Sequence, residues 1–327
     1  GRKKWGAKQK NTAHLATDGK RFFAPAEHGS KEVCVYAVDN AQPLAFGNGR
    51  QGLQPPPGSD DDEDNAPTGI VYSEGKIYVS FAARDLIGVY NAEQGNLQTT
   101  WKVSQPGRLA IAKDGALLAV SRDRVVRVLD GRSRPFITDH IDQPAGLAVD
   151  AAGNVYVANH GALHNVSVFE SSAKYLRSIG KSGGRPLVGP FDPAGMRNPA
   201  GIAVDGKGQL WVPEAIGSPK RLSLWDSTSG KLINEFFGAC SYSPFMWMDA
   251  ANPRETFFDN TIWSIDLDRG TWKPKSVFYR RTSPNMVNSG GGGFFHPARG
   301  NNGPHIFYVE FLAGQLVQPD GTDRYFL

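Results

Sequence analysis

The chain has 327 residues, of which 40% are hydrophobic, so it is long enough to bury a sizeable core. Its 38 glycines and 22 prolines indicate many short strands joined by turns, not long helices. The net charge of +4 is small, and the basic residues are scattered as singles and pairs, which argues against a nucleic-acid surface. No apolar run approaches ~18 residues, so we expect no membrane span.

The ends and the cysteines say little about chemistry. Cys34 and Cys240 lie far apart and have no CxxC or metal-ligand spacing, so we expect two buried thiols. The chain begins with "GRKKWGAKQK", without an apolar leader. We therefore expect a processed piece of a larger extracellular or periplasmic protein, whose signal is not present in this chain.

An internal repeat runs along the chain. The stretch "QPAGLAVDAAGNVYVANHG" at 143–161 returns as "NPAGIAVDGKGQLWVPEAIG" at 198–217. Four copies of the longer unit are clear, and three at the two ends are weaker. The seven units cover 12–48, 66–103, 105–138, 143–180, 198–238, 243–281 and 294–327. A spacing of about 47 residues is typical of the four-stranded blades of a β-propeller.

The repeat predicts the fold. Each unit contains short alternating strands, and no single unit can bury its own apolar surface without stacking on neighbours. Pairs such as Asp-Gly between the first and second strands supply tight hairpin turns. We predict one all-β propeller domain over 1–327 with minimal helix, seven blades being favoured and six the alternative. We also expect residues 323–327 to lie beside residues 5–14 and close the ring.

The pattern P-x-G-ϕ-A-V-D, followed by G-ϕ-ϕ-Y/W-V-A and V-x-V-F, where ϕ is an apolar residue, resembles the NHL repeat. The resemblance covers roughly 66–238 well and the flanking units loosely, and the usual end of the second turn is only partly present in "ANHGALHNVSVF". It implies a β-propeller fold. It does not imply an activity, because NHL propellers include both enzymes and binding modules.

Three insertions indicate which face of the propeller carries the functional site. They lie at 47–67, 180–199 and 282–293, and each joins the last strand of one unit to the first strand of the next. In a propeller these connections emerge on the same face as the loops between second and third strands. The segment "GKSGGRP" at 180–186 lacks the spacing of a phosphate-binding P-loop, so we expect no phosphate loop there.

Two columns of the repeat should surround the central axis on that face. The first column begins the innermost strand, where three of six units have glycine and the other three have His14, Arg108 and Met246. The second column ends the next strand, where one near copy has His160 and the other Ala215. We expect this position to face a ligand space. The candidate ligand-binding residues are His14, Glu27, His28, Arg108, Arg122, Asn159, His160 and Glu214.

Histidines in these columns suggest a possible metal. His14, His28 and His160 offer imidazoles to one divalent ion, zinc or calcium, with Glu27 or Glu214 as a base. No HxH or HExxH spacing supports this site, so its ligands would come from different blades.

Three functions follow from these patterns. The favoured one is a secreted or surface-exposed recognition propeller that binds a carbohydrate or a partner protein on the insertion-bearing face. The alternative is a metal-assisted lyase or hydrolase, since NHL-like propellers include an amidating lyase whose zinc is held by histidines. A structural role without a ligand is third. Whether the chain is an enzyme stays open at this point.

Overall fold

The computed structural model describes residues 15–25, 32–54, 56–58, 66–186, 189–214, 219–238, 246–249, 252–258, 261–277, 294–300, 303–310, 313–317 and 323–326. Among these residues, helix is limited to the short 3-10 turn Ala82–Arg84 (η2), and the remaining elements are strands. The all-β prediction is therefore confirmed. No described segment forms a helix with the length and hydropathy needed to span a bilayer.

Five sheets, each of four consecutive strands, come first along the chain. The first contains β1 (Ala16–Thr17), β2 (Arg21–Pro25), β3 (Val33–Ala37) and β4 (Gly52–Leu53). The second contains β5 (Gly69–Ser73), β6 (Lys76–Phe81), β7 (Leu86–Asn91) and β8 (Leu97–Lys102). The third contains β9 (Pro106–Ile111), β10 (Leu117–Ser121), β11 (Arg124–Leu129) and β12 (Arg132–Ile137). The fourth contains β13 (Pro144–Val149), β14 (Val155–Asn159), β15 (Val166–Phe169) and β16 (Tyr175–Ile179). The fifth contains β18 (Ala203–Val204), β19 (Gln209–Pro213), β20 (Lys220–Asp226) and β21 (Leu232–Gly238).

Two further sheets follow. One has five strands, namely β17 (Gly189–Pro190), β22 (Met246–Asp249), β23 (Asn252–Phe258), β24 (Thr261–Asp266) and β25 (Thr271–Val277). The last has four, namely β26 (Phe294–Gly300), β27 (Gly303–Glu310), β28 (Ala313–Val317) and β29 (Asp323–Phe326). The structure thus has six four-stranded sheets, which fits the six-bladed alternative. The favoured count of seven four-stranded blades is not met, because β17 adds a fifth strand beside β25.

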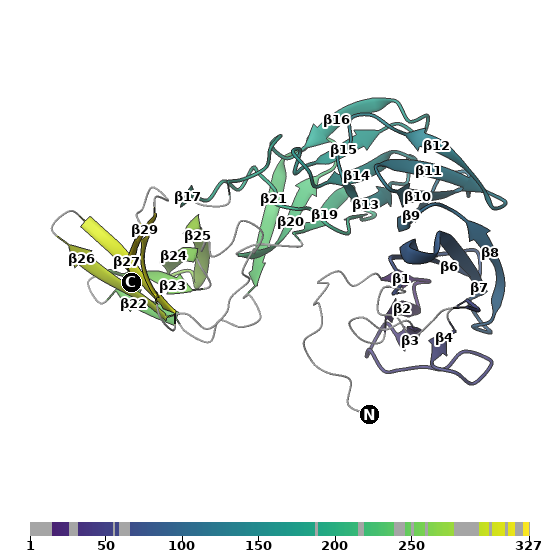
Figure 1. The fold of residues 1–327 in the computed structure, drawn as a ribbon, viewed down its shortest axis with the longest axis horizontal. Coiled ribbons are helices and arrows are strands. Elements are labelled where there is room, and N and C mark those ends of the chain that lie inside the picture. Colours follow the sequence, from purple (N-terminus) through teal and green to yellow (C-terminus); the bar gives the residue numbers. More distant parts are fainter. Residues whose placement is uncertain are drawn as a thin grey trace.

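The first five sheets follow one another around a curve, with their innermost strands β1, β5, β9, β13 and β18 in successive contact (Figure 1). The sheets of β22–β25 and β26–β29 lie at the other end of the molecule. The β22–β25 sheet meets the fifth sheet through a T-shaped contact between Phe237 and Trp263, whose ring centroids are 5.5 Å apart, and includes β17, which precedes the fifth sheet in the chain. The last sheet contacts the β22–β25 sheet through β22 and β26. β29 and β1 lie at opposite ends of the molecule in Figure 1, so the first and last sheets are not side by side. The predicted contact of the C-terminus with residues 5–14 lies outside the described residues.

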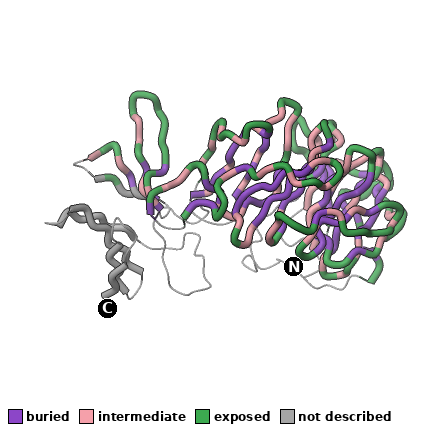
Figure 2. Tube along the Cα trace, turned by 90° about the horizontal axis from the view of Figure 1, so that it is seen from above, coloured by how far each residue is buried: buried purple, intermediate pink, exposed green. Residues whose placement is uncertain are grey.

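The second strands of the third and fourth sheets, β10 and β14, are buried on both faces, which explains their nearly continuous apolar sequence. In β10, Leu117 and Ala119 pack with the second sheet, whereas Leu118 and Val120 pack with the fourth. Alternate side chains of one strand therefore join two different sheets. Figure 2 shows this buried interior running through successive sheets while the outer turns stay exposed.

The glycine column of the repeat exists because the innermost strands approach each other closely. A Cβ at Gly146 would overlap the carbonyl oxygen of Ala200, and a Cβ at Gly69 would overlap that of Gly107. A residue with a side chain can occupy this column only where the local backbone makes room for it. Arg108 is such a residue, so the groups around it are described with the candidate site below.

The first unit extends further than the sequence predicted. Its fourth strand, β4, lies at Gly52–Leu53, within the segment expected to be an insertion, and pairs with β3 through Val33 and Leu53. The hydroxyl of Tyr90 in the second sheet donates to the carbonyl of Gln54 at 2.9 Å. A two-residue strand has too little pattern to be recognised from sequence alone. Cys34 is a buried free thiol, as predicted, and Cys240 lies outside the described residues.

Candidate functional site

Five of the eight predicted site residues are in described segments, and they all lie near the start of an innermost strand or the end of a second strand. Arg108 is in β9, Arg122 follows β10, Asn159 ends β14 and His160 follows it. Glu214 follows β19 and forms an isolated bridge with Pro199. His14, Glu27 and His28 lie outside the described residues, so their predicted roles stay predictions.

Arg108 reaches across the fourth sheet toward the fifth. Its Nε donates to the carbonyl of Ala145 at 3.2 Å, and its Cζ lies 3.7 Å from the place where a Cβ on Gly201 would stand. Gly201, which corresponds to Arg108 in the fifth unit, therefore leaves room for its side chain. Burial lowers the pKa of Arg108 to about 10, which is still high enough to keep the guanidinium charged at neutral pH.

His160 is close enough to this guanidinium to be affected by its charge. Its ring is half-buried and makes a hydrogen bond with the backbone of Pro199, but its Nε2 is buried and has no hydrogen-bond partner. Burial lowers the pKa of His160, and so does the charge of Arg108, against the opposing effect of the Pro199 contact. A buried polar atom without a partner is unfavourable unless a water or a ligand satisfies it.

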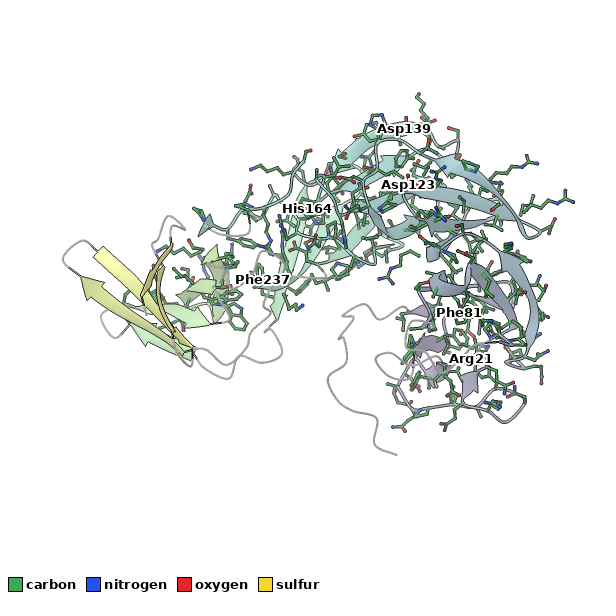
Figure 3. The ribbon with its side chains drawn as sticks, in the orientation of Figure 1. Arg21, Phe81, Asp123, Asp139, His164 and Phe237 are labelled. Atoms are coloured by element: carbon green, nitrogen blue, oxygen red, sulfur yellow. The ribbon has the colours of Figure 1, made fainter. Side chains whose placement is uncertain are left out.

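Two residues that the sequence did not single out continue the same cluster. His164 accepts a hydrogen bond at Nδ1 from the backbone N–H of Asn198 at 3.3 Å, and the Nε of Arg197 is buried without a partner. Burial, Arg197 and His160 together lower the pKa of His164. We call Arg108, His160, His164 and Arg197 the basic cluster. Figure 3 shows His164 between the fourth and fifth sheets.

Asn159 supports the loop that carries His160. Its side chain is fully buried, and its Nδ2 donates to Asn165 Oδ1 at 3.0 Å and to Ser167 Oγ at 2.9 Å. Its Oδ1 accepts from the backbone N–H of Asp142 at 3.0 Å. Because these bonds use the amide within the protein, its position is that of a structural residue, and a ligand contact stays a prediction.

Glu214 is the centre of a buried ion-pair network. Its two carboxylate oxygens lie 2.7 Å from Arg185 Nη2 and 3.1 Å from Arg221 Nη1. Arg221 also pairs with Glu235 at 2.9 Å and donates to two carbonyls of the 180–199 insertion, those of Gly195 and Pro193, at 2.7 and 2.6 Å.

This network ties the insertion to the fifth sheet. The guanidinium groups of Arg185 and Arg221 also face the ring of Phe191, at 5.3 and 5.5 Å from its centroid. The sequence did contain a signal for Arg221: it shares the inward-facing positions of β20 with Ser223 and Trp225, where a charge needs a buried partner. Arg185 had no such signal, because it lies in an irregular segment.

Arg122 differs from the other candidates because it is exposed. It occupies the two-residue turn between β10 and β11 with a φ of 56°, and its Nε donates to Ser104 Oγ at 3.2 Å. It can contact a ligand from the rim only. A ligand-binding role for Arg122 stays a prediction.

The described residues contain no group of three or more His, Cys, Asp or Glu side chains that could hold a metal ion. Since His14 and His28 are not described, a metal at His14, His28 and His160 stays a prediction. Glu214, a candidate base, is engaged by Arg185 and Arg221. A cation at His160 would also meet the positive charge of Arg108, which disfavours it.

No protein-family model matches the chain, and no curated protein has a matching sequence. Solved structures do match its fold. A nidogen/laminin complex matches with a TM-score of 0.51 and 14% identity, over 79% of this chain and 92% of that chain. A gluconolactonase from Xanthomonas campestris has a TM-score of 0.49 and 17% identity, over 75% and 81%. Hydrazine synthase from Kuenenia stuttgartiensis has a TM-score of 0.45 and 14% identity, over 82% and 81%. The nidogen/laminin match supports a β-propeller fold for the chain, in agreement with its all-β sheets.

Proposed function

We propose that this chain is a recognition propeller of NHL-type repeats that binds a carbohydrate or a partner protein, outside the cell or in the periplasm. The ligand binds on the face where the innermost strands begin. The observation that carries this proposal is the Glu214 network, which holds the 180–199 insertion against the fifth sheet. A loop that is already ordered loses less entropy on binding, so a rigid insertion favours recognition.

The polar residues of this face support the same function. Arg108 and His160 are half-buried beside the anchored insertion, close to Gly201 and Pro199 of the next sheet. The other described clear units have glycine in this column, which allows the strands to pack closely. A charged residue here therefore has no evident packing role. Polar groups that converge between rigid elements are typical of binding sites.

The experiment tests the face without changing its charge. Ser182 is exposed in the insertion, next to Gly183, whose N–H donates to Leu163 of the β14–β15 loop; Lys207 is exposed in the turn between β18 and β19, at the opposite end of the strands. The purified chain is screened on arrays of glycans and of purified extracellular proteins. We expect Ser182→Trp to lose the signal by steric block and Lys207→Trp to retain it. No signal on either array, or loss with Lys207→Trp alone, would contradict the proposal.

A metal-assisted lyase or hydrolase is the second candidate, favoured by the partnerless Nε2 of His160. Its test is metal analysis of the purified chain and of a His160→Ala variant. Stoichiometric zinc or calcium that disappears in the variant would favour the enzyme. A chain that binds no metal after equilibration with zinc and calcium would favour the recognition module.

A further inference from the structure

Positive charge gathers on the outer hairpin of the third sheet, which is formed by β11 and β12. Residues 124–137 contain four arginines and a single aspartate, a net charge of +3. The corresponding outer hairpins of the first, second, fourth and fifth sheets each carry a net charge of 0 or +1; they span residues 33–53, 86–102, 166–179 and 220–238. The surplus is therefore a property of the third sheet and not of the repeat.

The pairing of β11 with β12 brings three of these arginines onto one face. Arg127 lies directly opposite Arg134, and Arg132 lies two residues before Arg134 on the same strand. Leu118 of β10 is opposite Arg127 and packs towards the fourth sheet, so this face of the hairpin is the one turned to the fourth sheet. We call Arg127, Arg132 and Arg134 the arginine patch.

Two positive charges in directly opposite positions of a sheet repel each other. Arg127 is compensated, because it forms an ion pair with Asp114 and its Cζ lies over the ring of Phe136, 6.0 Å from the centroid. Arg132 and Arg134 are exposed, and within the described part of the chain they form no hydrogen bond or ion pair. Contacts inside the protein thus do not offset the repulsion, whereas an anion bound to the patch would do so.

The arginine patch lies where a long ligand can reach it. β12 is the outermost strand of its sheet, in the order β12-β11-β10-β9, and it lies on the outer side of the curve of sheets (Figure 1). Residues 132–135 are all exposed. Residues on one face of a strand follow one another at about 7 Å, so the guanidinium groups form a row. This row is separate from the face on which the innermost strands begin.

We propose that the arginine patch binds a sulfated polysaccharide. The forked N–H donors of arginine form paired hydrogen bonds with oxyanions such as phosphate, and a sulfate ester has the same tetrahedral geometry. A polymer that carries several sulfates can contact the whole row at once. The inference does not depend on the function proposed for the insertion-bearing face.

The apolar side chains of the hairpin favour this partner over a nucleic acid or an acidic protein. All of residues 124–137 are described, and Leu129 is the exposed large hydrophobic residue among them. Phe136, the single aromatic residue of the hairpin, is half-buried. The patch therefore has neither an aromatic platform on which bases stack nor the apolar centre of a protein interface, and a hydrophilic polyanion fits it better.

The probes separate these polyanions. A heparin decasaccharide is compared with the same fragment after desulfation and N-acetylation, which keeps its carboxylates, and with polyglutamate and a short DNA duplex. Binding to the full chain is measured by calorimetry at about 0.05 M and about 0.5 M salt. We expect saturable binding of the sulfated fragment that weakens at the higher salt concentration, and at least tenfold weaker binding of the other three probes.

The variants test whether the patch is responsible. Arg132→Ser with Arg134→Ser removes two exposed arginines, and the matched control, Arg254→Ser with Arg269→Ser, removes two exposed arginines of the β22–β25 sheet. Both double variants change the net charge by the same amount. We expect about tenfold weaker binding of the sulfated fragment by the first and little change with the second. The first should also melt no lower than the unmodified chain, because it relieves the repulsion with Arg127.

Three results would overturn the inference. One is that the sulfated fragment shows no saturable binding at the lower salt concentration. Another is an equal loss of affinity in the two double variants, which would mean that overall charge and not the patch attracts the polymer. The third is binding of DNA, polyglutamate or the desulfated fragment as tightly as the sulfated fragment, which would assign the surface to a different partner.

Discussion

The fourth and fifth sheets begin from nearly the same sequence but end their second strands in different ways. In the fourth, Asn159 at the end of β14 donates to Asn165, the residue before β15, at 3.0 Å. In the fifth, the corresponding residues are Glu214 and Arg221, which form an ion pair at 3.1 Å. A neutral amide pair and a buried charge pair thus occupy equivalent places.

Their first hairpins, by contrast, are alike. Tyr156 donates its hydroxyl to Asp150 Oδ2 at 3.0 Å, and Trp211 donates its Nε1 to Asp205 Oδ2 at 3.0 Å. The aromatic residue and the aspartate stand six positions apart in both units. The shared hairpin is needed to form and pack each sheet, so it repeats.

The difference between the two sheets follows from their neighbours. Glu214 and Arg221 meet Arg185 and the carbonyls of Gly195 and Pro193, all from the 180–199 insertion. Among the described residues, the amide pair of the fourth sheet bonds to Asp142, just before β13, and to Ser167 in β15, both of the same unit. Charges appear where an inserted segment must be held, and the comparison teaches that the end of the second strand is set by what packs on it.

The largest expected effect is on the charge pair. Glu214→Ala leaves Arg185 and Arg221 buried without their shared carboxylate, which costs about 3–5 kcal/mol of unfolding free energy. Urea denaturation measures it. The matched control is Glu255→Ala, which removes the more exposed pair with Lys275 and should cost less than about 1 kcal/mol. Equal costs for the two variants would mean that the Glu214 network does not hold the insertion.

The amide pair of the fourth sheet should be the weaker of the two. Asn159→Ala leaves the buried groups of Asn165 and Asp142 without a partner, at a cost of about 1–3 kcal/mol. The same urea experiment measures it. A loss as large as that of Glu214→Ala would remove the distinction between the two sheets.

A smaller effect tests how closely the two sheets approach each other. Gly146→Ala places a methyl group against the carbonyl of Ala200 and should destabilise the chain by about 1–2 kcal/mol. Gly206→Ala is the control, because a Cβ there has no atom within 4 Å. Melting temperatures of the two variants give the result. A lower melting temperature for Gly206→Ala than for Gly146→Ala would contradict the close approach of β13 and β18.

The smallest effect concerns the shared hairpin and pH. Burial alone would raise the pKa of Asp150, but hydrogen bonds from Asn154 and Tyr156 hold it below its ordinary value. A carboxyl with a lowered folded pKa contributes stability that is present above its unfolded pKa, about 3.9, and lost as pH falls through the folded value. We expect Asp150→Asn to flatten the loss of stability below about pH 4.

Urea denaturation at pH 7 and pH 3 measures that effect. Asp205→Asn in the fifth sheet should flatten it in the same direction, since hydrogen bonds from Trp211 and the backbone of Gln209 lower the pKa of Asp205 as well. An unchanged pH profile in both variants would show that these hairpins do not depend on the charged carboxylate.

Much of the fold was predictable because its determinants are local. The Gly-containing hairpin turns, the alternating strands and the spacing from Asp to the aromatic residue recur from unit to unit, so they can be recognised in a single sequence. Arg108 and His160 were predicted as site residues by comparing columns of the repeat, and the charge of Arg108 does act on His160, lowering its pKa. The pairing of Glu214 was not predicted, because its partners lie 29 residues before it, at Arg185, and seven after it, at Arg221.

By itself, the sequence determined that the chain is all-β, that its strands come in repeated groups of four and that one column of glycines is interrupted by Arg108. The tertiary structure decided that Gly189–Pro190 joins β25, that Glu214 is engaged inside the protein and that His160 Nε2 is left without a partner. The physical reason is the sequence separation of the interacting residues. Turns and strand patterns follow from interactions between neighbouring residues, whereas ion pairs and unsatisfied groups depend on which distant segments come into contact.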